Sequence, residues 1–291
     1  MTTRVWVDGG LVPAAEARIS ALDLGFRSGV GVFETLRVER GRAFRPGAHL
    51  ARLVAGARTL GYEPDPTDLR RGIAEVVTAN RHLGEQLALR VTCSPGPLAP
   101  DAPFPGTPSG PPTTVITVQP TAAASAQPSP ATATATPLRR EVAGIKHTSY
   151  LVSVLAQQQA MAAGCTDALL TAASGAPLEA ATANLLVVVE GGVLCTPPAS
   201  SGILAGVTRD AVLELAATDG IEVAERPISG EELRRAPEAL LTSAVRGVRA
   251  LVRVDGHAVG AGRPGPATRH LAAGYRSLVE RLGESVTVTG R

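Results

Sequence analysis

Residues 144–150 read Gly-Ile-Lys-His-Thr-Ser-Tyr, and Lys146 within this stretch is the only lysine of the chain. Lysine and arginine together number 28, so every other member of that set is arginine. Arginine can replace lysine on a solvated surface, but its guanidinium stays protonated and cannot form an imine. Lys146 is therefore either a surface residue kept by chance or an amine needed for covalent chemistry with a carbonyl group. Apolar neighbours on both sides would partly desolvate the amine and make it more nucleophilic.

Two other segments have side chains or backbone groups suited to a bound cofactor. Residues 200–209 read Ser-Ser-Gly-Ile-Leu-Ala-Gly-Val-Thr-Arg and place Thr208 at the expected start of a helix. Backbone N–H groups at a helix start can bind a phosphate, although most such turns are ordinary helix caps. Glu179 stands before a run of small residues. Its carboxylate either faces water at a strand edge or, if buried, needs a cationic partner such as a protonated ring nitrogen. His147 could assist the lysine, but a packing or surface role is more common.

Composition limits the classes of function that remain. The 291 residues are 44% hydrophobic and 19% charged, enough for one large or two medium domains. The net charge of +2 comes from scattered basic residues, so we expect a small-molecule substrate and no nucleic-acid partner. The sequence shows no signal peptide and no apolar run near the roughly 20 residues of a membrane span. Three widely spaced cysteines indicate neither a disulfide framework nor a metal site, so we expect a cytoplasmic protein without a membrane partner.

Hydrophobic periodicity and turn residues predict strands mixed with helices, which is typical of an α+β protein with two domains. The predicted helices cover residues 47–60, 68–79, 148–163, 209–217 and 267–282, and the predicted strands cover 5–7, 11–12, 32–38, 87–92, 114–118, 167–172, 178–189, 193–195, 221–224 and 239–243.

Residues 120–137 consist largely of Ala, Thr, Ser and Pro. This composition is typical of a solvated connector, and only its last Thr-Ala residues fit a strand. We therefore predict a smaller N-terminal α+β domain over residues 1–119, a connector over 120–137, and a larger C-terminal domain over 138–291 that binds the cofactor.

Several segments, taken in order, resemble the class IV aminotransferase family, whose members are fold-type IV pyridoxal-phosphate (PLP) enzymes. The matching segments are Leu24-Gly25-Phe26-Arg27-Ser28-Gly29-Val30-Gly31-Val32-Phe33-Glu34, His49-Leu50-Ala51-Arg52-Leu53, Gly144-Ile145-Lys146, Leu178-Glu179 with Asn184-Leu185, Thr196-Pro197-Pro198, residues 202–209 and Leu241-Thr242-Ser243-Ala244. Each segment is modest alone, but the ordered set covers nearly the whole chain and is specific.

The resemblance implies a two-domain fold-type IV enzyme, similar to D-amino-acid aminotransferase, that uses pyridoxal 5'-phosphate and is typically a homodimer. Lys146 would bind PLP as a Schiff base and move the proton, and Glu179 would keep the pyridine nitrogen protonated. The phosphate would be held by the Arg52 guanidinium, by the backbone N–H groups of Val207 and Thr208, and by Ser243. Phe33 and Arg246 are the expected substrate-binding residues.

Within the family, Lys146-x-Thr148-Ser149-Tyr150 and Leu-Thr-Ser-x-x-Arg246 look most like the 4-amino-4-deoxychorismate lyases. That branch releases pyruvate and 4-aminobenzoate, a step of folate biosynthesis, and aromatisation of the ring drives the reaction. The alternative is a class IV transaminase that moves an amino group from a small amino acid to a 2-oxo acid. A non-catalytic relative used as a binding module is a third interpretation, which the retained lysine disfavours. Cys93-Ser94-Pro95 stands where a Thr-Arg-Gly loop is common in the family, so the motifs leave the substrate open.

Overall fold

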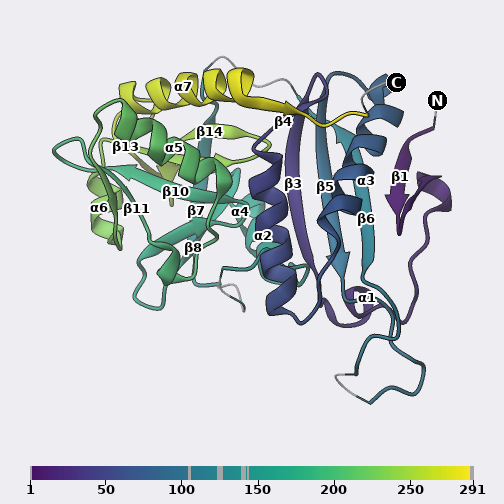
Figure 1. Ribbon diagram of the computed structural model, residues 1–291. Coiled ribbons are helices and arrows are strands. Elements are labelled where there is room, and N and C mark those ends of the chain that lie inside the picture. The colour runs from purple at the N-terminus through teal and green to yellow at the C-terminus, as the bar shows by residue number, and fades with distance from the viewer. Residues whose placement is uncertain (1, 104–105, 123–126, 139–141, 143, 289–291) are drawn as a thin grey trace. The chain divides into compact units, whose positions relative to one another are not determined.

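The computed structural model describes residues 2–288 except 104–105, 123–126, 139–141 and 143 (Figure 1). The chain divides into two compact units, which are considered one at a time. The first unit comprises Met1–Ala123, Ile145–Tyr150 and Leu282–Arg291, and the second comprises Ala124–Gly144 and Leu151–Arg281. This division differs from the predicted one, because the segment around Lys146 and the C-terminal residues belong with the N-terminal part of the chain.

The first unit contains a seven-stranded sheet with the strand order β16-β4-β3-β5-β6-β1-β2, and all its neighbouring strands are antiparallel. The strands are β1 (Arg4–Val7), β2 (Gly10–Pro13), β3 (Val32–Glu39), β4 (Arg42–Phe44), β5 (Gln86–Ser94), β6 (Thr113–Pro120) and β16 (Gly283–Ser285). The helices are the short α1 (Leu24–Ser28), α2 (Pro46–Thr59) and α3 (Pro66–Ala79).

Helices α2 and α3 cover one face of this sheet (Figure 1). The predicted apolar face of α2 is confirmed, since Leu50, Leu53, Val54 and Ala57 are all buried. These side chains are spaced by three or four residues and therefore lie on one side of the helix, where they pack on the apolar face of the sheet. The resulting core holds β3 and β5 firmly, and both strands carry residues of the candidate site.

The second unit is built around a closed ring of strands. β9 pairs with both β8 and β10, so β10-β13-β14-β7-β8-β9 returns to its starting point. The strands are β7 (Pro130–Thr136), β8 (Asp167–Thr171), β9 (Pro177–Ala180), β10 (Ala183–Val188), β13 (Glu238–Ser243) and β14 (Gly247–Val254), with β11 (Leu194–Thr196), β12 (Val223–Glu225) and β15 (His257–Ala258) attached. The helices are α4 (Leu151–Ala162), α5 (Val207–Thr218), α6 (Gly230–Arg235) and α7 (Pro266–Leu282).

The interior of this barrel is narrow and is filled by small side chains. One buried cluster takes residues from all six strands, and alanines are its commonest members. Interior positions of small barrels are filled by side chains and not by solvent, so the methyl groups of alanine suit the available space.

Strand β7 corrects the prediction of a connector over residues 120–137. Residues 130–136 form a strand that is parallel to both β8 and β14, with Ala131 and Ala133 fully buried inside the barrel. Bulky apolar residues were absent because the barrel interior has no room for them, so the usual signal for a strand was missing. The predicted strand over 178–189 is likewise two strands, β9 and β10, joined by a tight turn at Ala181-Thr182. Among the described helices, none combines the length and apolar character required to cross a bilayer.

Candidate active site

In the first unit, the stretch that carries Lys146 lies against the start of β3. The backbone N–H of Phe33 donates to the carbonyl of Lys146 over 2.8 Å, and the N–H of Thr148 donates to the carbonyl of Gly31 over 2.8 Å. Ile145 is buried in the core of this unit. These contacts fix the backbone on both sides of Lys146, and its Nζ lies 4.6 Å from the centre of the Phe33 ring.

Arg90 on β5 joins the same group of side chains and was not foreseen from the sequence. Its guanidinium carbon lies 3.6 Å from the centre of the Phe33 ring, and the Tyr150 ring meets Phe33 edge to face with centroids 5.3 Å apart. Burial lowers the pKa of Arg90, and the nearby Tyr150 opposes that effect. Its one hydrogen bond within the described part of the chain goes to the Thr92 hydroxyl over 3.3 Å. A half-buried guanidinium beside a lysine, without a carboxylate partner among these contacts, is suited to bind an anion.

Arg52 on α2 is held by a buried carboxylate of β3. Its Nε and Nη2 atoms lie 2.6 and 2.8 Å from the two carboxylate oxygens of Glu34, whose side chain is fully buried. The Nδ1 atom of His49 lies 2.8 Å from Oε2 of the same carboxylate. Burial alone would raise the pKa of Glu34, but the hydrogen bonds from His49 and Arg52 outweigh it and lower the pKa to about 2. The pair fixes two sides of the guanidinium fork, which has five N–H donors in total.

In the second unit, Glu179 on β9 is 3% exposed and is tied to the chain that leads into α5. Its Oε2 accepts hydrogen bonds from the backbone N–H of Leu204 over 3.1 Å and from Nδ2 of Asn184 over 3.3 Å. Asn184 also donates to the carbonyl of Leu204 over 2.7 Å. A buried carboxylate held by these two neutral donors is suited to accept a further bond from a protonated ring nitrogen.

The start of α5 lies next to this network. Its N-cap is Gly206, and no side-chain cap satisfies the first turn. A Cβ atom at Gly206 would lie 2.0 Å from Oδ1 of Asn184, so only glycine fits there. The first N–H groups, those of Val207 and Thr208, therefore point from a helix start that carries the positive end of the dipole. The Thr208 hydroxyl lies 3.2 Å from the Tyr275 hydroxyl, and Ser243 ends strand β13.

Arg246, an expected substrate residue, is engaged with its own unit. Its Nη2 lies 3.0 Å from Oδ1 of buried Asp167 and 2.7 Å from the Thr182 hydroxyl at the β9–β10 turn. Phe33, the other expected substrate residue, is 2% exposed and forms the surface on which Lys146 and Arg90 lie.

The predicted residues thus fall into two sets. The first unit brings together Lys146, Phe33 and the unforeseen Arg90, and holds Arg52 on Glu34. The second unit brings together Glu179 and the start of α5 with Val207 and Thr208. A primary amine, a buried carboxylate and an uncapped helix start are the groups that PLP needs for its aldehyde, its ring nitrogen and its phosphate.

Comparison with known proteins gives a match to the family model for amino-transferase class IV over residues 31–254. A curated relative, the D-alanine aminotransferase of Bacillus licheniformis, is 28% identical over 286 residues, which are 95% of this chain and 97% of the relative.

Solved structures agree with this match. The branched-chain aminotransferase of Thermoproteus uzoniensis, solved with norvaline, is 27% identical with a TM-score of 0.87 and covers 98% of this chain and 100% of its own. A bacterial branched-chain amino acid aminotransferase solved with pyridoxamine 5'-phosphate is 25% identical with a TM-score of 0.88 and covers 99% of both chains. The described architecture is thus the two-domain α+β fold of these fold-type IV enzymes. The chain belongs to the class IV aminotransferase family, and its cofactor is pyridoxal 5'-phosphate.

Proposed function

We propose that this protein is an aminotransferase that moves an amino group from a small amino acid to a 2-oxo acid, with Lys146 as its catalytic amine. The observation that carries the proposal is the position of the only lysine of the chain, beside Phe33 and the half-buried Arg90. The amine of Lys146 binds the cofactor and moves the proton at its Nζ atom. PLP supplies an electron sink when it is bound.

The other residues act by binding and orientation. The Glu179 carboxylate keeps the ring nitrogen of the cofactor protonated, because a buried carboxylate is stabilised by a cationic partner. The N–H groups of Val207 and Thr208, the Arg52 guanidinium and Ser243 bind the phosphate. Arg90 binds the carboxylate that both an amino acid and a 2-oxo acid carry.

The comparisons favour aminotransfer over the lyase reaction that the motifs led us to expect. The relatives reported above are named D-alanine aminotransferase and branched-chain aminotransferase. In addition, Arg246, which belongs to the lyase-like motif, is tied to Asp167 and Thr182. The names differ in the handedness and side chain of the substrate, so both are to be measured.

The test uses the fact that only one side chain can form the Schiff base. Borohydride reduction of the PLP-loaded protein and peptide mapping should place the phosphopyridoxyl group on Lys146, and Lys146→Ala should lack the visible absorption band. L-Leucine, L-glutamate or D-alanine should then convert the parent to its pyridoxamine form and release the matching 2-oxo acid. Pyruvate release from aminodeoxychorismate, with no response to any amino acid, would refute aminotransfer and restore the lyase.

We also propose that the protein is a homodimer, with α4 at the interface. Leu151, Val154, Leu155 and Met161 lie on one side of this helix and are 67%, 44%, 42% and 67% exposed. A contiguous exposed apolar stripe is typical of a protein–protein contact. Val154→Glu should shift the mass measured by light scattering toward the monomer, whereas Ala217→Glu on an exposed position of α5 should not. An unchanged mass for Val154→Glu would refute α4 as the interface.

A further inference from the structure

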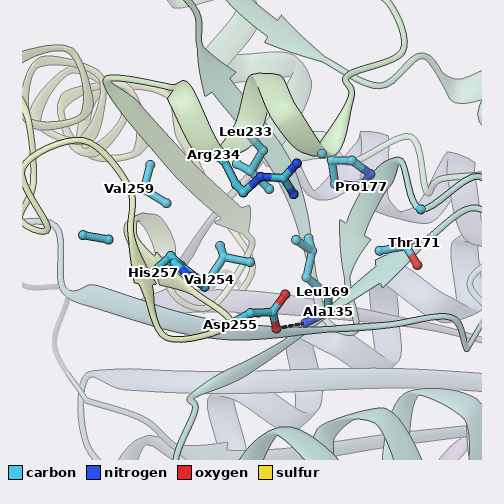
Figure 2. A pocket seen from close by; sticks show the side chains of 13 residues that line it. Ala135, Leu169, Thr171, Pro177, Leu233, Arg234, Val254, Asp255, His257 and Val259 are labelled. Atoms are coloured by element: carbon cyan, nitrogen blue, oxygen red, sulfur yellow. Dashed lines mark hydrogen bonds between the residues drawn. The ribbon is translucent and has the colours of Figure 1, made fainter.

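A pocket of about 190 Å³ opens at one end of the barrel in the second unit (Figure 2). Its floor is formed by Ala135 of β7 and Leu169 of β8, and Leu233 of α6 and Val254 of β14 form its walls. Small residues at the rim, including Gly230 and Ala258, leave the space open. An apolar cavity of about 150 Å³ is enough to hold benzene, so this pocket can take a slightly larger molecule.

Two groups of opposite charge face this apolar space from different elements. The guanidinium of Arg234 extends over the pocket from α6 (Figure 2). Asp255 contributes a carboxylate from the β14–β15 turn. Oδ1 of Asp255 accepts from the Thr134 hydroxyl over 2.9 Å and from the N–H of Ala135 over 2.8 Å. The other carboxylate oxygen points toward the centre of the pocket (Figure 2).

The geometry points to a second binding site, for a zwitterionic amino acid with an apolar side chain. The ammonium group binds to the inward-facing oxygen of Asp255, and the carboxylate binds to Arg234. The side chain packs against Leu169, Leu233 and Val254. A simple carboxylic acid would suffer repulsion from Asp255, and a simple amine would leave Arg234 without an anion. The lining therefore selects a molecule that carries both charges.

This site is separate from the Glu179 network because the two lie on opposite faces of the same strands. In the β8–β9 ladder, Leu169 is opposite Ala180, and Leu170 is opposite Glu179. Successive residues of a strand point to opposite faces. Leu169 faces the barrel interior and the pocket, so Glu179 faces outward. The site is an addition to the proposed aminotransferase and does not depend on it.

The test measures binding of L-leucine by equilibrium dialysis to the PLP-loaded, borohydride-reduced protein, in which Lys146 is blocked. The same titration is made with 4-methylpentanoate and 3-methylbutylamine, which keep the side chain but carry one charge each. We expect saturable binding of leucine that Arg234→Gln weakens roughly tenfold or more, the effect of losing a charge-assisted hydrogen bond. Arg235→Gln is the matched control, since Arg235 is on the same helix but bonds to Glu231.

Leucine binding that falls in Arg234→Gln and in Asp255→Asn, but not in Arg235→Gln, would support the site. The absence of saturable binding to the reduced parent would overturn it. Equal affinity for leucine and 4-methylpentanoate would overturn the role of Asp255 and with it the proposed ligand class. Failure of the proposed aminotransfer would show in the spectrum of the unreduced protein and would leave this titration unaffected.

Discussion

Glu34 holds Arg52 through two parallel contacts, in which Nε and Nη2 of the guanidinium each meet a different carboxylate oxygen, at 2.6 and 2.8 Å. His49 binds the same carboxylate at 2.8 Å. Bidentate pairs of this kind fix the plane of a guanidinium as well as its position. The fold therefore sets the orientation of the one side-chain cation proposed to bind the cofactor phosphate.

The first prediction concerns the acid stability of this pair. The pKa of Glu34 is lowered from 4.5 to about 2 in the folded protein. Its contribution to stability is therefore complete above pH 4.5 and is lost as the pH falls through about 2. The shift corresponds to about 3 kcal/mol. Glu34→Gln should lower the free energy of urea unfolding by that order near pH 7, and its deficit should shrink toward pH 3.

The control for this measurement is Glu63→Gln. Glu63 also pairs with an arginine, Arg58, but both side chains are more than half exposed. Exposed ion pairs contribute about 1 kcal/mol or less. A deficit for Glu34→Gln that is no larger than that of Glu63→Gln, or that does not change with pH, would contradict the prediction.

The second prediction separates the shape of Arg52 from its charge. Arg52→Lys keeps a cation but loses the planar fork, so it cannot bind Glu34 and a phosphate in fixed directions at once. We expect the dissociation constant of PLP, from absorbance titration of the apoprotein, to rise roughly tenfold. Arg58→Lys on the exposed side of the same helix should leave it unchanged. Equal affinities for all three proteins would remove Arg52 from the phosphate site.

The third prediction tests Arg90 as the carboxylate-binding residue. Arg90→Gln should raise the KM of both the amino acid and the 2-oxo acid roughly tenfold or more, because a charge-assisted bond to substrate is lost. The visible spectrum with PLP should not change. Arg71→Gln is a matched control, since Arg71 lies 4.8 Å from the Trp6 ring in the same unit. A lower kcat with an unchanged KM would instead assign Arg90 to the lysine and not to the substrate.

The fourth prediction concerns the barrel interior. Ala133 is 1% exposed and stands inside the closed ring of strands. Ala133→Leu adds three carbons to a filled interior and should cost about 1 to 3 kcal/mol of unfolding free energy. Ala122→Leu, at an exposed position of the same predicted connector, should cost far less. Similar stability of the two variants would mean that β7 is not packed as described.

Local patterns carried much of the fold but not its closure. The helix predicted over 47–60 is α2, because its apolar period of three and four is a property of the segment alone. Strand β7 was missed because its alternation of alanine and threonine has meaning only inside a ring of six strands. The pairing of β9 with both neighbours, which closes that ring, is a long-range property that no window of sequence displays.

The same distinction holds for the candidate site. Lys146 stood out because it is the only lysine. Arg90 is one of many arginines, and its position over Phe33 depends on the pairing of β3 with β5 across some fifty residues of chain. The register places Thr35 opposite Arg90 and Phe33 opposite Thr92, so Arg90 and Phe33 share a face of the sheet. A polar residue in an apolar strand was the available signal.

The pairing of β16 with β4 has a consequence for the newly made chain. Gly283 at the end of the protein lies opposite Phe44, so the edge of the N-terminal sheet waits for almost the whole chain to be synthesised. Translation adds about 5 to 20 residues each second, so β4 stays uncovered for many seconds on the ribosome. An uncovered strand edge can pair with a neighbouring nascent chain. The last ten residues therefore act as a closing seal, and their arrival times the end of the interval in which this protein is most prone to aggregate.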